Sequence, residues 1–301
     1  MSTETDEVLR QAKPSRALAL LRMSVPKTLT RRRGHQLAFV TKLAMAVLAI
    51  IVLAAVFAPW LTPYDPAVGE LADRLEPIGT PGHILGTDEQ GRDMLTRLMY
   101  GGRISLLSAL VPVALATAVA LVLGLVAGSS RGILSAVIMR VLDVFFAFPA
   151  IMLAIGVTAA LGPGLQNSFV ALAIVFVPPL ARVVEAATRR VSAMEYIQAA
   201  QLTGASRAKI LVLQVLPNVL PSVFTYAASL MAVSMLLMAG LSFVGLGVSP
   251  PTAEWGYMLG SMRDQLYTYP VNAITPGFLI FLTAVALNTV SDGLRDASEE
   301  R

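Results

Sequence analysis

Residues Ile104–Gly128 read ISLLSALVPVALATAVALVLGLVAG, an unbroken run without a charged side chain. The hydrocarbon core of a bilayer is about 30 Å thick, and a helix needs about 20 residues to cross it. Because lipid offers the backbone no hydrogen-bond partner, such a run must form a helix or join a closed barrel. Barrel strands alternate in polarity, and this run does not alternate. It therefore predicts a membrane-spanning helix.

The whole chain has the same apolar character. Of its 301 residues, 55% are hydrophobic and only 14% are charged, and the mean hydropathy is +0.69. A soluble domain has about 25% charged residues, and a disordered chain needs low hydrophobicity with high charge. The composition excludes both classes.

Five further apolar segments lie on either side of this run. Residues 144–181 carry no charge, which is too long for one span, and Leu161-Gly162-Pro163-Gly164 divides them because glycine and proline end helices. We therefore predict an all-α integral membrane protein with six transmembrane helices. The expected spans are about 43–60, 104–128, 133–160, 166–184, 218–246 and 271–291.

Positive charges predict the orientation of these spans. Eight basic residues precede the first span: Arg10, Lys13, Arg16, Arg22, Lys27, Arg31, Arg32 and Arg33. If the chain crosses the membrane six times, seven further basic residues lie on the same side as this N-terminal group: Arg131, Arg189, Arg190, Arg207, Lys209, Arg295 and Arg301. Cytoplasmic loops carry an excess of Lys and Arg. Both termini should therefore be cytoplasmic, and segments 61–103 and 247–270 should lie outside. The long polar stretch before the first span favours an uncleaved anchor over a signal peptide.

Several kinds of chemistry are excluded by the residues that are absent. There is no cysteine, and the two histidines, His35 and His83, lie far apart, each expected at the surface. We predict no catalytic residue and no metal site. Without a Gly-Lys dipeptide there is no phosphate-binding P-loop, so the chain cannot itself be a P-loop ATPase. No dense basic face with aromatic readers supports nucleic-acid binding.

Charge within the apolar runs is also sparse. Arg140 and Asp143 are the one charged pair well inside such a run, and their i,i+3 spacing predicts a local pair on one helix face. A secondary transporter would need ionisable groups in its spans or an internal repeat. Neither is evident, so that alternative is less favoured.

The segment 185–217 is long for a cytoplasmic loop and has helical character. Tyr196, Ala199 and Ala200 recur at helical spacing, Gly204 suits a turn that needs φ > 0, and Ser206 can cap a second helix. Pro217 should interrupt that second helix. The pattern predicts a helix–turn–helix whose small Ala-Ala-x-x-x-Gly surface allows another protein to approach closely. An amphipathic helix lying in the lipid headgroups fits its basic residues as well.

The spacing of that segment resembles the cytoplasmic signature loop of ABC-importer membrane subunits. Motifs over residues 40–296 resemble, in order, dipeptide and oligopeptide permeases of the second type. They are Asp65-Pro66, His83-x-Leu85-Gly86-Thr87-Asp88-x-x-Gly91-Arg92-Asp93, Tyr100-Gly101-Gly102-Arg103-Ile104-Ser105-Leu106, the Leu161–Gly164 break, Leu241-Ser242-Phe243-x-Gly245-Leu246-Gly247, Pro250-Pro251-x-x-x-Trp255-Gly256, Pro276-Gly277 and Asp292-Gly293-Leu294-Arg295-Asp296. Gln198 and Gln214 depart from the usual pattern.

The resemblance implies a type I ABC-importer permease fold and a domain organisation. Residues 1–36 would be a cytoplasmic tail, 37–103 the first transmembrane helix with its extracytoplasmic loop, and 293–301 a second cytoplasmic tail. The core transmembrane domain would be 104–292, with the coupling loop at 185–217. The residues expected to couple to an ATPase are Glu195, Tyr196, Ala199, Ala200, Gly204, Ala205, Ser206, Ile210 and Pro217.

The resemblance also implies partners and a cargo. A second, homologous permease subunit would complete the path, two ABC ATPase subunits would carry ATP and Mg, and an extracytoplasmic binding protein would deliver di- or oligopeptides. This chain would bind lipid but no cofactor, as a non-enzymatic subunit in the bacterial inner membrane. Nickel chelates or glutathione are alternative solutes within the same family.

A polar cluster lies in the outer loop that would face the binding protein. It consists of Gly86, Thr87, Asp88, Gly91, Arg92 and Asp93. Loops of about 40 residues are usually functional or ordered by a partner. We expect a structured segment at the outer vestibule near the docked binding protein. A self-contained cap, held by an Asp88–Arg92 or Asp93–Arg97 pair, is the alternative.

Overall fold

The computed structural model describes residues 27–130 and 132–299, with side chains over 39–130 and 132–296. Several basic residues used for the predicted orientation lie outside the described residues: Arg10, Lys13, Arg16, Arg22, Arg131 and Arg301. The chain divides into two units, Met1–Val40 and Thr41–Arg301. The first unit is described only from Lys27, where a helix begins, and the account below concerns the second.

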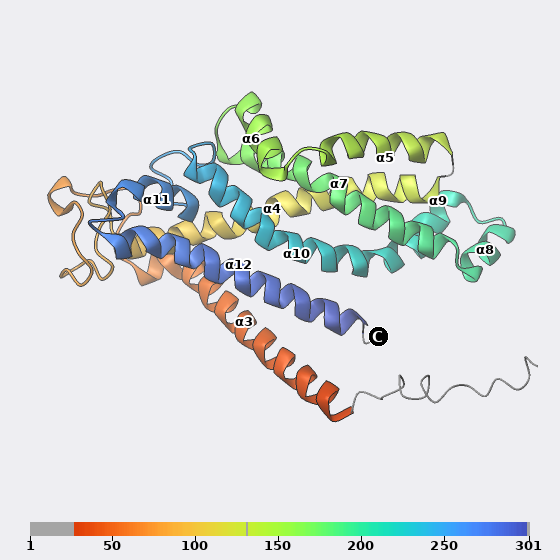
Figure 1. Cartoon of the computed structure of the whole chain (residues 1–301), viewed down its shortest axis with the longest axis horizontal. Coiled ribbons are helices and arrows are strands. Elements are labelled where there is room, and N and C mark those ends of the chain that lie inside the picture. The colour runs from red at the N-terminus through yellow and green to blue at the C-terminus, as the bar shows by residue number, and fades with distance from the viewer. Residues whose placement is uncertain (1–26, 131, 300–301) are drawn as a thin grey trace, which may run out of the picture. The chain divides into compact units, whose positions relative to one another are not determined.

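Regular structure in the described residues is entirely helical, as predicted. Five long helices have the length and hydropathy to cross a membrane: α3 (Lys27–Leu61), α4 (Met94–Ser129), α7 (Leu165–Ser192), α10 (Leu216–Phe243) and α12 (Pro270–Glu299). Shorter helices complete the chain: α5 (Ile133–Phe146), α6 (Ala150–Leu161), α8 (Glu195–Leu202), α9 (Arg207–Ile210) and α11 (Trp255–Ser261). Figure 1 shows α8 and α9 at one end of the Thr41–Arg301 unit and α11 at the other.

Helices α4 and α7 form the centre of this unit, where small residues let their backbones approach. A Cβ at Gly124 would lie 2.5 Å from Val184 Cβ, and one at Gly128 would lie 2.6 Å from Thr188 Cβ. Around this contact lies the larger buried cluster, which includes Ala116, Ala120, Leu172, Phe176 and Leu180. Without a hydrophobic force between helices in lipid, close van der Waals packing supplies their association.

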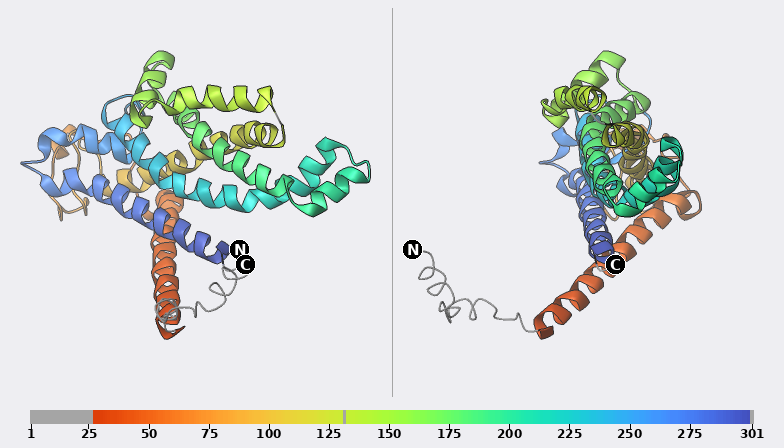
Figure 2. Two further views of the ribbon diagram at one scale, coloured as in Figure 1. Left: turned by 45° about the vertical axis from the view of Figure 1, so that its right-hand side comes forward. Right: turned by 90° about the vertical axis from the view of Figure 1, so that its right-hand side faces the viewer.

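The prediction of one continuous helix over 133–160 is wrong. The segment forms two helices, α5 and α6, that meet at an angle of 91°, so the described helices count as six spans only if this bent pair is one of them. Pro149 is the cause, because it has no N–H to donate and disfavours helical geometry at the preceding Phe148. The two views of Figure 2 show α6 turned away from the direction of α5.

The predicted interruption at Pro217 is also wrong. The helix that begins at Arg207 continues to Phe243. A π-helical turn at Leu211–Val215 precedes the proline, and the Leu216 N–H donates to the Leu211 carbonyl five residues earlier. The wider π-helical turn accommodates Pro217, which would otherwise leave a carbonyl of the preceding turn without its usual N–H partner.

Helix ends differ from the predicted spans because hydrogen bonds set them, not hydropathy. Helix α4 begins at Met94, ten residues before the predicted span, because the Asp93 carboxylate accepts the Thr96 N–H. Likewise α3 begins at Lys27, inside the predicted tail, and α12 continues to Glu299. The predicted Arg140–Asp143 pair is also wrong, since Asp143 pairs with Arg182 on α7.

Candidate functional site: an exposed helix pair and an outer cap

The segment between α7 and α10 folds back as the two short helices α8 and α9. One side chain, Ile197, anchors it: only 1% of this residue is exposed, and it belongs to the main buried cluster. Ala200 and Ala205 pack against the same cluster, and Ile210 is also buried. The sequence prediction missed Ile197, although its large apolar side chain among polar neighbours was the available signal.

The turn between the two helices has the geometry that the sequence predicts. Gly204 has φ +83°, a conformation that side-chain-bearing residues rarely adopt, and its N–H donates to the Gln201 carbonyl. A Cβ at this glycine would meet no atom within 4 Å, so backbone conformation alone requires glycine here. Ser206 caps α9, accepting the Lys209 N–H at 3.4 Å. The turn and the cap are both confirmed.

The outer side of this helix pair is uncovered. Leu202 is 90% exposed, Tyr196 is 46% exposed, and Met194 is also exposed. Most of the predicted coupling residues lie on this exposed surface: Glu195, Tyr196, Ala199, Gly204 and Ser206. Pro217 is exposed too but lies farther along, in α10. Leu202, which the sequence analysis did not single out, is the most exposed aliphatic side chain of the group.

At the other end of the unit, an ion cluster holds the loop that precedes α4. The Asp88 carboxylate contacts Arg92, with Oδ2 2.7 Å from Nη2, and lies 3.2 Å from Arg97 Nε. It also accepts the backbone N–H groups of Gln90 and Arg92. All three charged side chains are almost completely buried. A buried charge is tolerated only when it is paired in this way.

Arg97 joins this cluster to the second outer segment. Its Nη1 donates to the carbonyls of Pro66 at 2.7 Å and Pro251 at 3.3 Å. Asn272 of α12 donates to the Thr87 carbonyl, and Glu254 caps α11 through the N–H groups of Gly256 and Tyr257. The two segments predicted to lie outside the membrane, 61–103 and 247–270, therefore form one cap.

The six predicted vestibule residues are buried within this cap. The Asp88–Arg92 pair of the alternative interpretation is present. Its other suggested pair, Asp93–Arg97, is not, because Asp93 accepts from Thr96 and lies 3.0 Å from His83 Nδ1. The expectation of a surface His83 is wrong, since its side chain is only 14% exposed. For His35, the side chain lies outside the described residues.

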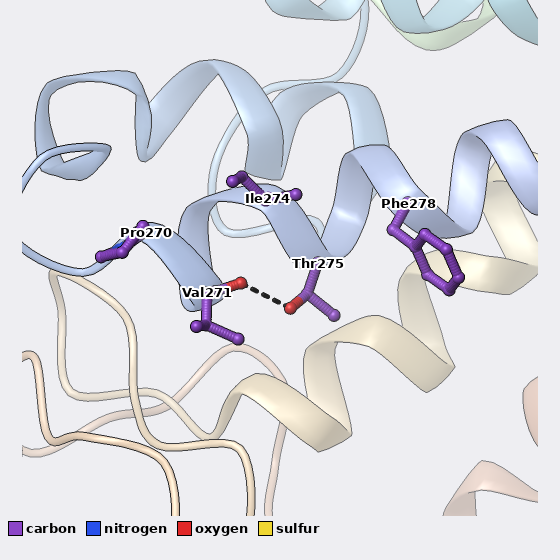
Figure 3. A pocket seen from close by; sticks show the side chains of 5 residues that line it. All are labelled: Pro270, Val271, Ile274, Thr275 and Phe278. Atoms are coloured by element: carbon purple, nitrogen blue, oxygen red, sulfur yellow. Dashed lines mark hydrogen bonds between the residues drawn. The ribbon is translucent and has the colours of Figure 1, made fainter.

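One shallow hollow lies on α12, lined by Pro270, Val271, Ile274, Thr275 and Phe278 (Figure 3). Its lining is apolar, and the Thr275 hydroxyl donates back to the Val271 carbonyl. It offers no charged group to a polar ligand. In the described part of the chain, no three His, Cys, Asp or Glu side chains group together as metal ligands would.

Comparison with known proteins places this architecture in a family. Residues 120–301 match the model of the binding-protein-dependent transport system inner membrane component. The chain belongs to this family of ABC-transporter permeases. Residues 40–77 match the N-terminal transmembrane domain of oligopeptide transport permease C.

Two relatives and one solved structure illustrate the similarity. A di/tripeptide transport system permease protein of Pseudomonas aeruginosa is 40% identical over 84% of this chain and 85% of its own. A glutathione transport system permease protein of Pectobacterium atrosepticum is 39% identical over 84% of each chain. The inward-facing MetNI methionine ABC transporter matches 67% of this chain and 97% of its own, with 21% identity and a TM-score of 0.56. The fold is therefore that of an ABC-importer permease, as the sequence predicts.

Proposed function

We propose that this chain forms half of a translocation path for di- or oligopeptides across a bacterial inner membrane. A second permease subunit supplies the other half, and an extracytoplasmic binding protein delivers the peptide. Two ABC ATPase subunits hold ATP and Mg, so the chain itself binds no cofactor. The observation that carries this proposal is the exposed helix pair α8–α9, fixed to the transmembrane core by Ile197 and turned at Gly204.

The helix pair is suited to transmit force because it is rigidly seated yet uncovered. Ile197 and Ile210 are buried in the core, while Tyr196 and Leu202 project from the surface. When ATP binding draws the ATPases together, a helix docked in one of them moves with it. The α7 and α10 helices on either side then shift, which opens the path alternately to each face.

The cap supports an orientation of the chain in the membrane and a docking place for the binding protein on its outer side. With α8–α9 facing the cytoplasm, the cap faces outward and both termini are cytoplasmic. The predicted vestibule residues do not touch the delivered protein directly, because they are buried. They hold the outer surface in shape instead. Peptide is the favoured cargo because the relatives named above carry di/tripeptide and glutathione in their names, and glutathione is itself a tripeptide derivative.

The proposal is tested by purifying this chain with the products of its neighbouring genes and reconstituting the complex in proteoliposomes. We expect labelled dipeptide to accumulate only when ATP and the loaded binding protein are both present. A complex that lacks an ATPase subunit, or that accumulates peptide equally well without ATP, would contradict it. Glutathione and a nickel chelate, supplied in parallel, distinguish the alternative solutes.

A further inference from the structure

The charged pair between α5 and α7 lies on the membrane-spanning part of this chain, away from both the helix pair α8–α9 and the outer cap. Arg182 of α7 donates through Nη2 to the Asp143 carboxylate of α5. The two side chains are 46% and 39% exposed. The Arg182 guanidinium also lies over the Phe146 ring, 4.9 Å from its centre. Both ions therefore lie on an open face of the chain beside an aromatic ring.

The two helices place this pair at the same depth. Arg182 is ten residues before the end of α7, and Asp143 is ten residues after the start of α5. At 1.5 Å per residue, each lies about 15 Å from that helix end. Leu165 begins α7 seventeen residues earlier, about 26 Å away. With α8–α9 in the cytoplasm, the pair lies inside the membrane and closer to its inner face.

Lipid is a poor environment for this face. Charged side chains within a membrane are costly unless they face a bundle interior or a water-filled cavity. Helix α5 ends only three residues beyond Asp143, and residues 144–152 are all exposed. Non-helical backbone at membrane depth is tolerated only where protein covers it or it lines water. The face therefore borders the path or the partner permease.

Arg182 also differs from its neighbours on α7. From Ala171 to Val184 the other described residues are buried or half-buried, and only Arg182 is exposed. The next charged residues toward the cytoplasm have partners of their own: Arg189 donates to Glu185 and to Ser135 Oγ. Arg182 is thus the cation that α7 presents to this open face.

We propose that Arg182 and Asp143 form a subsite for the charged ends of a free peptide. A guanidinium has five N–H donors and binds a carboxylate through two parallel hydrogen bonds. In this structure one nitrogen, Nη2, donates to Asp143. When a zwitterionic peptide binds, the Arg182–Asp143 ion pair is replaced by two others. The peptide carboxylate pairs with Arg182, and the peptide ammonium pairs with Asp143. Phe146 supplies an apolar surface for the intervening atoms.

This inference rests on the proposed function, and its test separates the two. The reconstituted importer is given three forms of one dipeptide: free, C-terminally amidated and N-acetylated, each saturating the binding protein. Wild type, Arg182→Gln and Asp143→Asn are compared. Arg140→Gln is the matched control, because it removes an exposed charge from the same helix, α5. If wild type takes up none of the three peptides, the proposed function itself fails.

We expect the two variants to change selectivity in different ways. Arg182→Gln should lower uptake of the free peptide about tenfold and abolish its preference over the amide, while the preference over the acetylated form persists. Asp143→Asn should abolish the preference for the free peptide over the acetylated form, while the preference over the amide persists. Arg140→Gln should change neither preference. Because the binding protein is the same in every experiment, a change in the uptake ratios between peptides is caused by the permease.

A structural pair would behave differently. Both variants would then lower uptake of all three peptides by one common factor, or change nothing, and either result would overturn the proposal. Membrane content and ATPase activity stimulated by the loaded binding protein report whether each variant assembles. If Arg182→Gln fails to assemble, Arg182→Lys replaces it. A lysine keeps the charge but loses the paired donors, so it should weaken the preference for the free carboxylate without abolishing it.

Discussion

Gly204→Val should reduce ATP-driven uptake by about 5- to 150-fold while the chain remains in the membrane. The backbone at this position has φ +83°, and no neighbouring atom would meet an added Cβ. The penalty therefore comes from conformation alone and amounts to about 1–3 kcal/mol for a side chain in this region. For a β-branched residue such as valine, the penalty lies at the upper end of this range. The turn would then relax and the α8–α9 surface would lose its shape. Uptake and ATPase rates in proteoliposomes measure the effect.

Two further variants control for this result. Gly204→Asn should retain most uptake, because asparagine tolerates positive φ better than other residues. Gly245 has the same φ of +83° and also no atom within 4 Å of an added Cβ, but it follows α10 at the other end of the unit. Gly245→Val should therefore keep ATPase and uptake coupled. Equal uncoupling by both valine variants would count against a specific role for the α8–α9 turn.

Asp88→Ala should destabilise the outer cap by about 3–5 kcal/mol, the usual cost of breaking a buried ion pair. The substitution leaves Arg92 and Arg97 buried without their carboxylate. Thermal unfolding in detergent, followed by the fluorescence of Trp255 in a Trp60→Phe background, reports the loss directly, because Trp255 is buried beside α4 and donates to the Leu98 carbonyl.

The matched control for the cap is Glu70→Ala, which removes an exposed acid from the same loop. It should change the stability by no more than about 0.5 kcal/mol. The double variant Asp88→Ala, Arg92→Ala should cost less than the sum of the two single changes, because only Arg97 then remains uncompensated. Additive losses would show that the pair does not hold the cap.

The sequence predicts the helical class and the Gly204 turn because each depends on local chemistry. Uncharged runs determine which segments enter lipid, and a glycine before a capping serine marks a turn. The sequence does not predict Asp143's partner, because Arg182 lies 39 positions away and only packing of α5 on α7 brings them together. The same holds for Arg97, whose carbonyl partners at Pro66 and Pro251 come from two separate outer segments.

The remaining errors concern proline and helix ends. Pro149 breaks the helix over 133–161, whereas the helix continues through Pro217 because a π-helical turn precedes it. One residue type has opposite outcomes, because the second proline lies where a widened turn relieves the lost hydrogen bond. Buried Ile197 was missed because Met194 and Leu202 in the same segment are also apolar, and only packing shows that Ile197 faces the core while the other two are exposed.

A single engineered cysteine tests the central claim most directly. The chain contains no cysteine, so Leu202→Cys introduces a unique thiol on the exposed face of α8. Tyr267→Cys is the matched control, because Tyr267 is 95% exposed but lies between α11 and α12 at the cap. Each variant is assembled with its ATPase partner and treated with a short reagent that joins a thiol to an amine, so that the introduced cysteine can be linked to a lysine of the neighbouring subunit. We expect Leu202→Cys to cross-link to the ATPase subunit and Tyr267→Cys not to. A cross-link to the ATPase from Tyr267→Cys, or none from Leu202→Cys in an assembled complex, would contradict the assignment of α8–α9 as the coupling element.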